Sequence, residues 1–200
     1  MQTYQCLEYL NSLLTDELVV TNLGGVAREL QHLNDRPGNL YRPYMGFTIP
    51  LALGLALALP HRRVIAVDGD GSLLMGLSVL PALAAQSPSN LIVIVMDNEA
   101  YQATGGPPTF TARATDLARM AAAAGVPNTS QVKGLREFTV ALDAAFAGSA
   151  TSFINAKVAQ ATEAVPYSTL DGIENKYRFV RHIEATEHTE ILKKPRKQPL

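Results

Sequence analysis

The sequence predicts an α/β fold in which a mostly parallel sheet has helices on both faces, giving three layers. Two runs, 64–68 (VIAVD) and 91–96 (LIVIVM), are apolar on both faces. Central strands of a parallel sheet are buried on both sides and show this continuous hydrophobicity. These runs alternate with longer helical patterns, which is typical of parallel sheets. A hydrophobic content of 47% over 200 residues is enough for one buried domain of this kind.

The sequence pattern in the first part of the chain predicts two short helices, one strand and one strongly apolar helix. The predicted helices cover 2–14 and 26–33, with a strand at 17–21 between them and a turn at Asn22-Leu23-Gly24-Gly25. The run 46–59 (GFTIPLALGLALAL) has no polar face. A helix that is apolar all round is buried, and we expect this one to lie under the sheet or in a subunit interface.

The second part continues the alternation. After the strand at 64–68 we predict a helix over 73–86, the strand at 91–96 and a long loop over 99–114 that is rich in Gly, Pro and Thr. Loops of this length usually have a functional reason. Helices at 115–124 and 134–147 and strands at 129–132 and 152–156 complete the predicted domain, 1–160. Residues 161–200 are predicted to be an extension with a helix at 172–184, followed by a disordered end.

Charge and cysteine content restrict the class of protein. A formal net charge of −1 provides no long-range attraction to nucleic acid or to an anionic membrane. Cys6 is the single cysteine, so no disulfide framework is expected and a reducing cytoplasm is the natural compartment. The first thirty residues lack a signal-peptide pattern, and the apolar run 49–59 is too short to span a bilayer. We therefore expect a cytoplasmic protein that binds neither nucleic acid nor a membrane.

The most informative segment is Asp68-Gly69-Asp70-Gly71-Ser72, between a predicted strand and a predicted helix. The glycines let the backbone approach a ligand closely, and the following helix offers unpaired N–H groups to an anion. A diphosphate fits this description, with the Ser72 hydroxyl as a further donor. Asp70 would repel that diphosphate unless a cation lay between them. Mg²⁺ suits this role, because it combines one or two protein oxygens with phosphates and water.

A second metal ligand is expected from the neighbouring strand, which ends at Asp97-Asn98-Glu99. A single right-handed crossover joins the two strands, so they should be adjacent and parallel, about 4.8 Å apart. Asp70 and Asn98 would then emerge at the same carboxyl edge, where open α/β sheets bind ligands. Asn98 supplies a neutral oxygen, which limits the negative charge around an anionic diphosphate.

The run Gly69-Asp70-Gly71-Ser72, followed by Asn98, resembles the motif of thiamine-diphosphate enzymes. The resemblance implies that Asp70, Asn98 and the backbone carbonyl of Ala100 ligate Mg²⁺. Further positions are implied to contact the cofactor. Tyr44-Met45-Gly46 resembles the element whose bulky side chain, here Met45, supports the bent thiamine; Gly24 and Gly25 match a loop that touches the diphosphate; and Tyr101 could reach the cofactor.

Within that family the chain is most similar to the beta subunit of sulfopyruvate decarboxylase and to the matching half of phosphonopyruvate decarboxylase. The resemblance implies a subunit of a 2-oxoacid decarboxylase that self-associates through its diphosphate-binding domain. It also implies that a separate pyrimidine-domain subunit supplies the glutamate that activates the cofactor, so that this chain alone is inactive. Gln102, Phe110 and Tyr44 depart from the subgroup pattern at positions expected to face the cofactor's reactive end or the substrate. A more apolar 2-oxoacid is therefore a plausible substrate.

Two other functions are compatible with parts of the sequence. A strand ending in Asp68-x-Asp70 also resembles the haloacid-dehalogenase phosphatases, in which the first aspartate is the nucleophile. Those enzymes need a lysine and a later acidic pair; Lys157 follows a predicted strand, but no acidic pair follows it. The departures at Gln102 and Phe110 also leave open a cofactor-binding module without catalytic activity.

Overall fold

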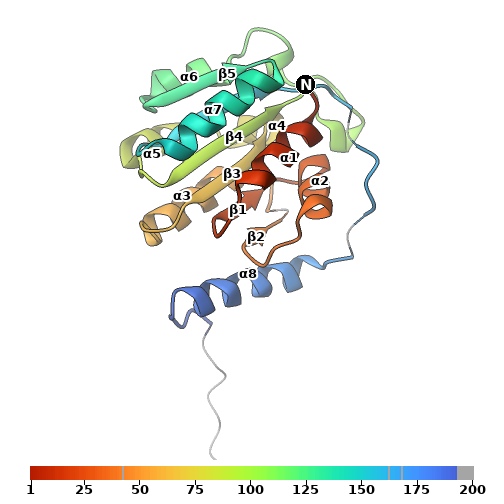
Figure 1. The fold of residues 1–200 in the computed structure, drawn as a ribbon. Coiled ribbons are helices and arrows are strands. Elements are labelled where there is room, and N and C mark those ends of the chain that lie inside the picture. The colour runs from red at the N-terminus through yellow and green to blue at the C-terminus, as the bar shows by residue number, and fades with distance from the viewer. Residues whose placement is uncertain (42, 162, 168, 193–200) are drawn as a thin grey trace, which may run out of the picture.

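A six-stranded, fully parallel sheet forms the centre of the protein (Figure 1). The computed structural model describes residues 1–41, 43–161, 163–167 and 169–192. The strand order is β2-β1-β3-β4-β6-β5. The strands are β1 (Leu18–Thr21), β2 (Asn39–Leu40), β3 (Val64–Gly69), β4 (Leu91–Asp97), β5 (Asn128–Val132) and β6 (Ser152–Lys157). The three-layer α/β fold predicted from the sequence is confirmed.

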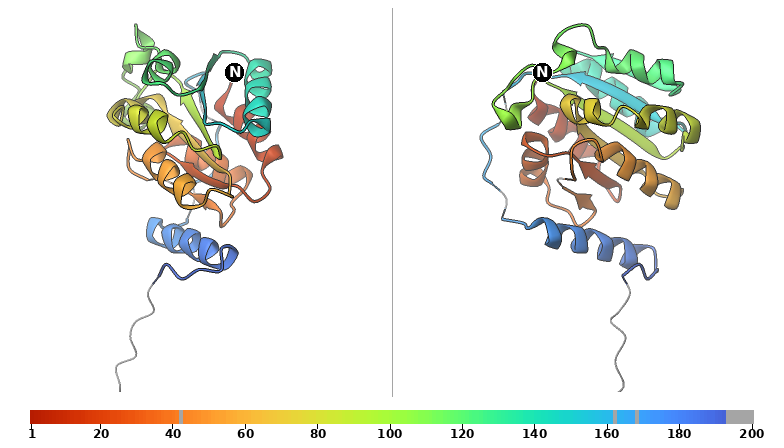
Figure 2. Two further views of the ribbon diagram at one scale, coloured as in Figure 1. Left: turned by 90° about the vertical axis from the view of Figure 1, so that its left-hand side faces the viewer. Right: turned by 180° about the vertical axis from the view of Figure 1, so that it is seen from behind.

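Helices cover both faces of this sheet, as the two views of Figure 2 show. One face carries α1 (Thr3–Leu13), α2 (Gly25–Leu33) and α7 (Leu135–Ala147). The other carries α3 (Thr48–Ala58), α4 (Asp70–Met75), α5 (Val79–Gln86) and α6 (Leu117–Ala124). Two short 3-10 turns, η1 (Gln102–Thr104) and η2 (Phe110–Ala112), lie in the loop after β4.

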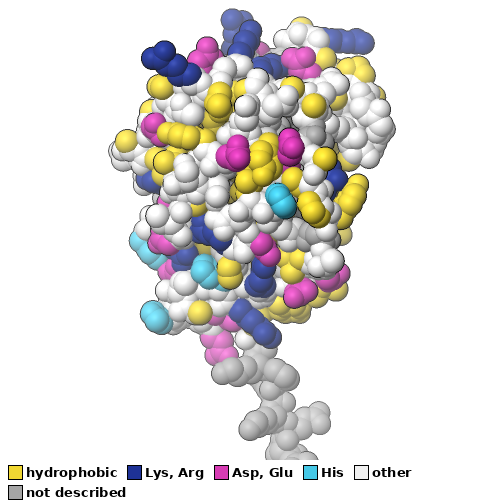
Figure 3. All heavy atoms as spheres, turned by 45° about the vertical axis from the view of Figure 1, so that its right-hand side comes forward, with side chains coloured by type: hydrophobic (Ala, Val, Ile, Leu, Met, Phe, Trp, Pro, Cys, Tyr) yellow, Lys and Arg dark blue, Asp and Glu magenta, His cyan; other side chains and the backbone are white. Residues whose placement is uncertain are grey.

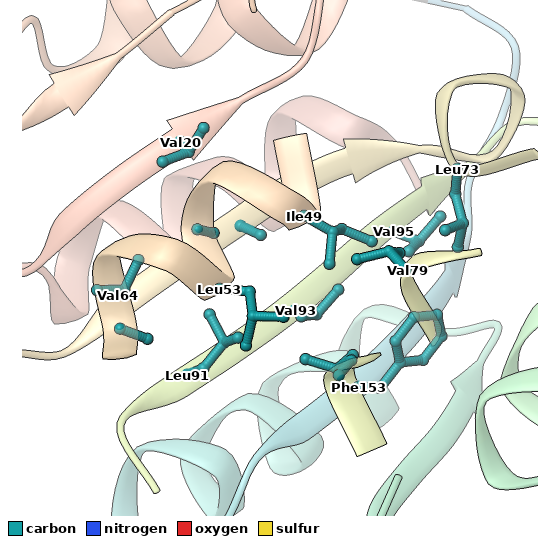
Figure 4. Close-up of a cluster of buried hydrophobic side chains, with 14 of the residues drawn as sticks. Val20, Ile49, Leu53, Val64, Leu73, Val79, Leu91, Val93, Val95 and Phe153 are labelled. Atoms are coloured by element: carbon teal, nitrogen blue, oxygen red, sulfur yellow. The ribbon is translucent and has the colours of Figure 1, made fainter. Parts of the chain in front are cut away.

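The strands bury apolar side chains on both faces, which is why they appear in the sequence as continuous hydrophobic runs. Figure 4 shows one of the two clusters, in which Ile49 and Leu53 of α3 lie beside Leu91, Val93 and Val95 of β4. The second cluster packs α1, α2 and α7 against the opposite face of the same strands. The two cores hold β3 and β4 rigidly, so the residues that follow these strands start from fixed positions.

The strand register places the ends of β3, β4 and β6 side by side. Gly69 pairs with Met96, and Asp97 pairs with Lys157. Because all strands are parallel, their carboxyl ends meet at one edge of the sheet. The segments that begin at Asp70 and at Asn98 therefore leave the sheet next to one another, as the sequence predicts.

A last helix, α8 (Gly172–Thr186), lies along the edge strand β2 at one end of the sheet (Figures 1 and 2). Asn175 accepts a hydrogen bond from the Tyr41 N–H at 2.8 Å and donates one to the Asn39 carbonyl at 3.1 Å. Phe179 and Ile183 join the hydrophobic cluster around α3. The disordered end expected from the sequence falls at 193–200, outside the residues that the structure describes.

Two local predictions were wrong. The helix expected over 73–86 is two helices, α4 and α5, separated by a turn at Gly76. Strand β2 was missed, because two residues are too short to produce a pattern.

The apolar helix predicted over 46–59 lies under the sheet with one face, where Ile49 and Ala52 are buried. Phe47 and Leu51 on its other face are 58% and 40% exposed, and burial of that face in a subunit interface stays a prediction.

The surface is mixed in charge. On the face drawn in Figure 3, acidic and basic side chains are interspersed among hydrophobic and neutral ones, in agreement with the net charge of −1. Among the residues described, no helix combines the length and the hydrophobicity needed to cross a bilayer.

Candidate cofactor site

A cavity opens at the carboxyl edge of the sheet, between the ends of β1, β3 and β4. Its walls come from the loop before α2, the turn before α3, the start of α4 and the loop after β4. The lining residues are Thr3, Asn22, Leu23, Gly24, Gly25, Val26, Met45, Gly69, Asp70, Gly71, Ser72, Met96, Asn98, Ala100, Tyr101, Gln102, Ala103 and Thr104. Segments that are far apart in the sequence thus meet at the place where open α/β sheets bind ligands.

Most of the residues selected from the sequence lie around this cavity. Those lining it are Gly24, Gly25, Met45, Gly69, Asp70, Gly71, Ser72, Asn98, Ala100 and Tyr101. Gly46 is adjacent to it and donates its N–H to Ser72 Oγ at 3.0 Å. Tyr44 is not part of the lining; its side chain is 83% exposed. Of the three departures from the family pattern, Gln102 lines the cavity, whereas Tyr44 and Phe110 point away into solvent.

Asp70 is a buried carboxylate without a basic partner. It is 2% exposed, and none of the ion pairs among the described residues includes it. Burial raises the pKa of Asp70, the nearby Asp97 raises it further, and hydrogen bonds from Thr109 and Thr111 oppose the rise. A buried charge is costly unless it is paired or coordinates a metal. This environment therefore fits a carboxylate that receives its counter-charge from a bound cation.

The neutral oxygens beside Asp70 come from the loop after β4. Asn98 Oδ1 accepts the N–H of Ala100 at 3.1 Å, which holds the amide close to the backbone. The same loop folds back as a hairpin, with hydrogen bonds from Tyr101 N to Pro107 O and from Thr109 N to Glu99 O. These bonds do not use the Ala100 carbonyl, which stays available as a ligand.

This donor set fits Mg²⁺ better than a metal bound by protein alone. In the described part of the chain no three His, Cys, Asp or Glu side chains gather in a way that could hold a metal ion. One carboxylate, one amide oxygen and one carbonyl would leave positions for phosphate oxygens and water, the arrangement that Mg²⁺ favours with phosphate ligands. The residues present therefore fit a magnesium diphosphate.

Asp68 and Ser72 lie at the end of β3 and in the first turn of α4. Asp68 is 1% exposed and accepts the Gly69 N–H at 2.9 Å. Burial raises the pKa of Asp68 to about 6, and the hydrogen bond from Gly69 opposes the rise. Ser72 lines the cavity and its Oγ accepts the Gly46 N–H at 3.0 Å, and its role as a hydroxyl donor to the diphosphate stays a prediction. Asp68 is also absent from the cavity lining, so it is not placed as a phosphatase nucleophile.

Two close backbone approaches shape the walls. A Cβ at Gly76 would lie 2.6 Å from the Gly46 carbonyl oxygen, so the break between α4 and α5 is what lets the Met45-Gly46 turn settle against α4. A Cβ at Gly71 would lie 2.5 Å from the Tyr101 ring, which packs directly on the backbone at that point. These approaches place Met45 and Tyr101 at the cavity, and each requires a glycine, which has no Cβ, at the point of contact.

Four residues that were not among the predicted cofactor or metal ligands lie behind the site, and one of them, Lys157, was considered above only for the phosphatase interpretation. Thr109 and Thr111 hydrogen-bond Asp70, while Asp97 accepts from Thr111 and pairs with Lys157 at 2.9 Å. Asp97 and Lys157 follow directly from the strand register. The threonines lie in a loop without periodicity, so nothing in the local sequence relates them to a carboxylate 39 and 41 residues away.

The fold and the cavity together define a class of protein, the α/β proteins that bind a phosphorylated cofactor at the carboxyl edge of a parallel sheet with the help of a cation. The chain belongs to the thiamine pyrophosphate enzymes, because the family model "Thiamine pyrophosphate enzyme, C-terminal TPP binding domain" matches residues 25–156. The matched region contains every lining residue of the cavity except Thr3, Asn22, Leu23 and Gly24.

Proteins of known name resemble the chain over most of its length. It is 37% identical over 189 residues to the sulfopyruvate decarboxylase subunit beta of Methanothermobacter thermautotrophicus, covering 94% of this chain and 98% of that protein. It is 39% identical over 138 residues to the phosphonopyruvate decarboxylase of Streptomyces hygroscopicus, covering 68% of this chain and 34% of that one. The resemblance to this subgroup that the motifs indicated is therefore confirmed.

Solved structures support the same fold. The thiamine diphosphate-dependent 4-hydroxybenzoylformate decarboxylase of Rhodococcus jostii RHA1 superposes with a TM-score of 0.65 at 22% identity, covering 80% of this chain and 33% of that one. The benzoylformate decarboxylase of Polynucleobacter necessarius gives a TM-score of 0.67 at 19% identity, with the same coverage. The chain thus corresponds to about one third of these larger chains.

Proposed function

We propose that this chain is the cofactor-binding subunit of a thiamine-diphosphate-dependent 2-oxoacid decarboxylase that acts on a sulfopyruvate-like or phosphonopyruvate-like acid. The observation that carries the proposal is Asp70, a buried carboxylate without a basic partner that lines one cavity together with Asn98 and Ala100. We assign these three residues as the protein ligands of Mg²⁺, which in turn holds the diphosphate. The names of the relatives support the reaction class.

The remaining lining residues receive positioning roles. Backbone N–H groups at Gly71 and Ser72 face the diphosphate, and Gly24 and Gly25 approach it from the opposite wall. Met45 supports the thiamine, and Tyr101 lies against Gly71 at the same cavity. When bound, the cofactor supplies the electron sink that lets a 2-oxoacid lose carbon dioxide, so this chain contributes position and charge.

A second subunit completes the proposal. The relatives named as beta subunits support a hetero-oligomer. We assign the activating glutamate to a partner with a pyrimidine-binding domain. We further propose that the chain associates with itself. The reducing cytoplasm is the proposed compartment, in which the buried thiol of Cys6 stays free.

Calorimetric titration of thiamine diphosphate tests the cofactor assignment. The titration is run with and without Mg²⁺, on this chain alone and on this chain mixed with the partner encoded by its neighbouring gene. We expect magnesium-dependent binding that the partner tightens and that Asp70→Ala weakens by about 100-fold or more, since even residues behind a metal ligand are worth 10–100-fold. Asp16→Ala, an exposed aspartate just ahead of β1 at the opposite edge of the sheet, is the matched control.

Binding and turnover separate the candidate functions. Carbon dioxide release from a 2-oxoacid by the mixture, but not by this chain alone, supports the proposed subunit role. Tight binding with no turnover of any 2-oxoacid would instead identify a module that binds the cofactor without catalysis. Absence of binding with and without the partner, or equal binding by the wild type and Asp70→Ala, contradicts the proposal.

A further inference from the structure

Two threonine hydroxyls lie on the carboxylate to which we assign the metal. Thr109 Oγ1 is 2.6 Å and Thr111 Oγ1 is 3.1 Å from the same oxygen, Asp70 Oδ2. The two hydroxyls are 2.8 Å from each other, and all three residues are buried. Neither threonine forms a hydrogen bond with the other carboxylate oxygen, Oδ1. The loop after β4 therefore holds one of the two oxygens of the Asp70 carboxylate.

The number of hydroxyl protons decides which carboxylate each threonine donates to. Each threonine has one hydroxyl proton to donate. The shortest contact of Thr109 is to Asp70, whereas that of Thr111 is to Asp97 Oδ1 at 2.7 Å. Asp97 is itself held, because its Oδ2 accepts from Asn155 at 3.0 Å and pairs with Lys157. Each threonine thus serves one carboxylate, and the Asp97–Lys157 pair fixes the orientation of Thr111.

The charges around the threonines also differ between the Asp97 side and the Asp70 side. Lys157 lies 2.9 Å from Asp97 and 2.7 Å from Glu99, so this lysine compensates the carboxylates on the far side of the threonines. Its Nζ also donates to the Thr111 carbonyl oxygen at 3.3 Å, which holds the backbone beside the hydroxyl. Asp70, on the near side, has no such cation among the described residues. The threonines therefore separate a carboxylate pair that shares one lysine from a carboxylate that needs an external cation.

The threonines also connect two of the assigned ligands. Thr109 closes the hairpin through its N–H to the Glu99 carbonyl, and that hairpin carries Ala100 and follows directly on Asn98. Any displacement of Thr109 from Asp70 would move the Ala100 carbonyl relative to the carboxylate. The geometry of the assigned metal site is consequently set by contacts behind it.

We infer that Thr109 and Thr111 are positioning residues. Thr109 donates its hydroxyl proton to Asp70 Oδ2, and Thr111, whose proton goes to Asp97, holds the loop behind Thr109. Together they leave Asp70 Oδ1 to the metal and fix the loop ligands at the distance that Mg²⁺ requires. This inference rests on the proposed function. Mg²⁺ demands near-ideal octahedral geometry, whereas Ca²⁺ accepts variable coordination. Loss of a hydroxyl should therefore weaken binding through Mg²⁺ more than binding through Ca²⁺.

The test compares Thr109→Val and Thr111→Val with the wild-type chain in the presence of the partner. Affinity for thiamine diphosphate is measured by calorimetry with Mg²⁺ and, separately, with Ca²⁺. We expect each valine variant to lose about 10–100-fold in magnesium-dependent affinity, the usual effect of removing a partner of a metal ligand, and to lose less with Ca²⁺. Thr111→Ser, which keeps the hydroxyl, should retain most of the wild-type affinity. Thr115→Val changes a threonine just after the loop whose hydroxyl makes no hydrogen bond in the structure, and should match the wild type.

A second measurement needs no cofactor. Hydrogen exchange at the Thr109 amide reports whether the hairpin is closed, and it should be faster in both valine variants than in the wild type and in Thr115→Val. Unchanged exchange and unchanged affinity in the valine variants would overturn the inference. Equal losses with Mg²⁺ and Ca²⁺ would also overturn it, because they indicate a merely structural role. A wild-type chain that binds no cofactor would overturn the proposed function itself.

Discussion

Glu29 of α2 is a fully buried carboxylate outside the candidate site. Its Oε1 accepts the Glu163 N–H at 2.9 Å, but its Oε2 has no hydrogen-bond partner among the residues that the structure describes. Burial raises the pKa of Glu29, against the opposing effects of that hydrogen bond and of Arg28. Because the pKa is higher in the folded than in the unfolded state, the stability from this group is fully present below the unfolded pKa. It is lost as the pH rises through the folded pKa.

Glu29→Gln should therefore stabilise the protein at high pH. The amide keeps the acceptor for Glu163 and removes the buried charge, and we expect Tm to rise by about 2–4 °C at pH 8, the shift that about 1 kcal/mol produces in a domain of this size. The difference should shrink towards pH 4. Thermal unfolding followed by circular dichroism measures it, with Glu8→Gln, an exposed change on the adjacent helix α1, as control. A Tm gain that is independent of pH would contradict the explanation.

At this scale the sequence predicts the residues that line the cavity better than the residues behind them. Asp70 and Asn98 could be selected because parallel strands bring their ends together whatever the surrounding side chains are. Thr109 and Thr111 could not, because their contact with Asp70 depends on how an irregular loop folds back. Tyr44 was selected because it precedes Met45, yet adjacent residues in a turn point in different directions, and only Met45 faces the cavity.

Among the elements, the boundary between α4 and α5 was missed. Residues 73–86 contain one glycine and one proline, Gly76 and Pro81. A glycine inside a helix is usually tolerated at about 1 kcal/mol, but proline is tolerated only in the first turn, and Pro81 lies in the first turn of α5. The chain turns at Gly76, where the Gly46 backbone packs against it. Pro81 is thus a local signal for the break, and the contact with Gly46, which local propensity does not report, accompanies its position at Gly76.

Gly76→Ala should destabilise the fold and displace Met45. Its Cβ would meet the backbone oxygen of Gly46 at 2.6 Å, and backbone cannot move aside as a flexible side chain can. We expect a loss of about 1–3 kcal/mol in the free energy of unfolding, the usual cost of overpacking, measured by urea denaturation. Gly172→Ala at the start of α8, where nothing lies within 4 Å, is the control. Equal stability of the two variants would show that the close approach is not required.

In the molecule as a whole, α3 has an exposed apolar face. Phe47, Leu51, Gly54 and Ala58 are exposed and spaced as one stripe of a helix. The sequence predicted an apolar helix without saying which side is buried, because a uniform composition contains no direction. The structure resolves this, since Ile49, Ala52 and Ala56 face the sheet.

We predict that self-association uses this stripe. Leu51→Glu should raise the dissociation constant of the self-associated form by about 100-fold or more, since a charge buried without a partner costs several kcal/mol. Sedimentation velocity over a range of concentrations measures the change. Val140→Glu introduces the same charge at a 61% exposed apolar position of α7, on the opposite face of the sheet, and should leave association unchanged. A wild-type chain that is monomeric at all concentrations, or a Leu51→Glu variant that associates normally, would contradict the prediction.

The start of the chain lies at the carboxyl edge of the sheet. The Met1 carbonyl accepts the Ala159 N–H at 2.9 Å, just past the end of β6, and Thr3 is part of the cavity wall. The chain leaves α8 at the other end of the molecule (Figure 1). A purification tag or a fused domain placed ahead of Met1 would thus emerge beside the cavity and could obstruct it. A tag that follows α8 would lie away from the site, which makes that end the better one for attaching the protein to a support or a dye.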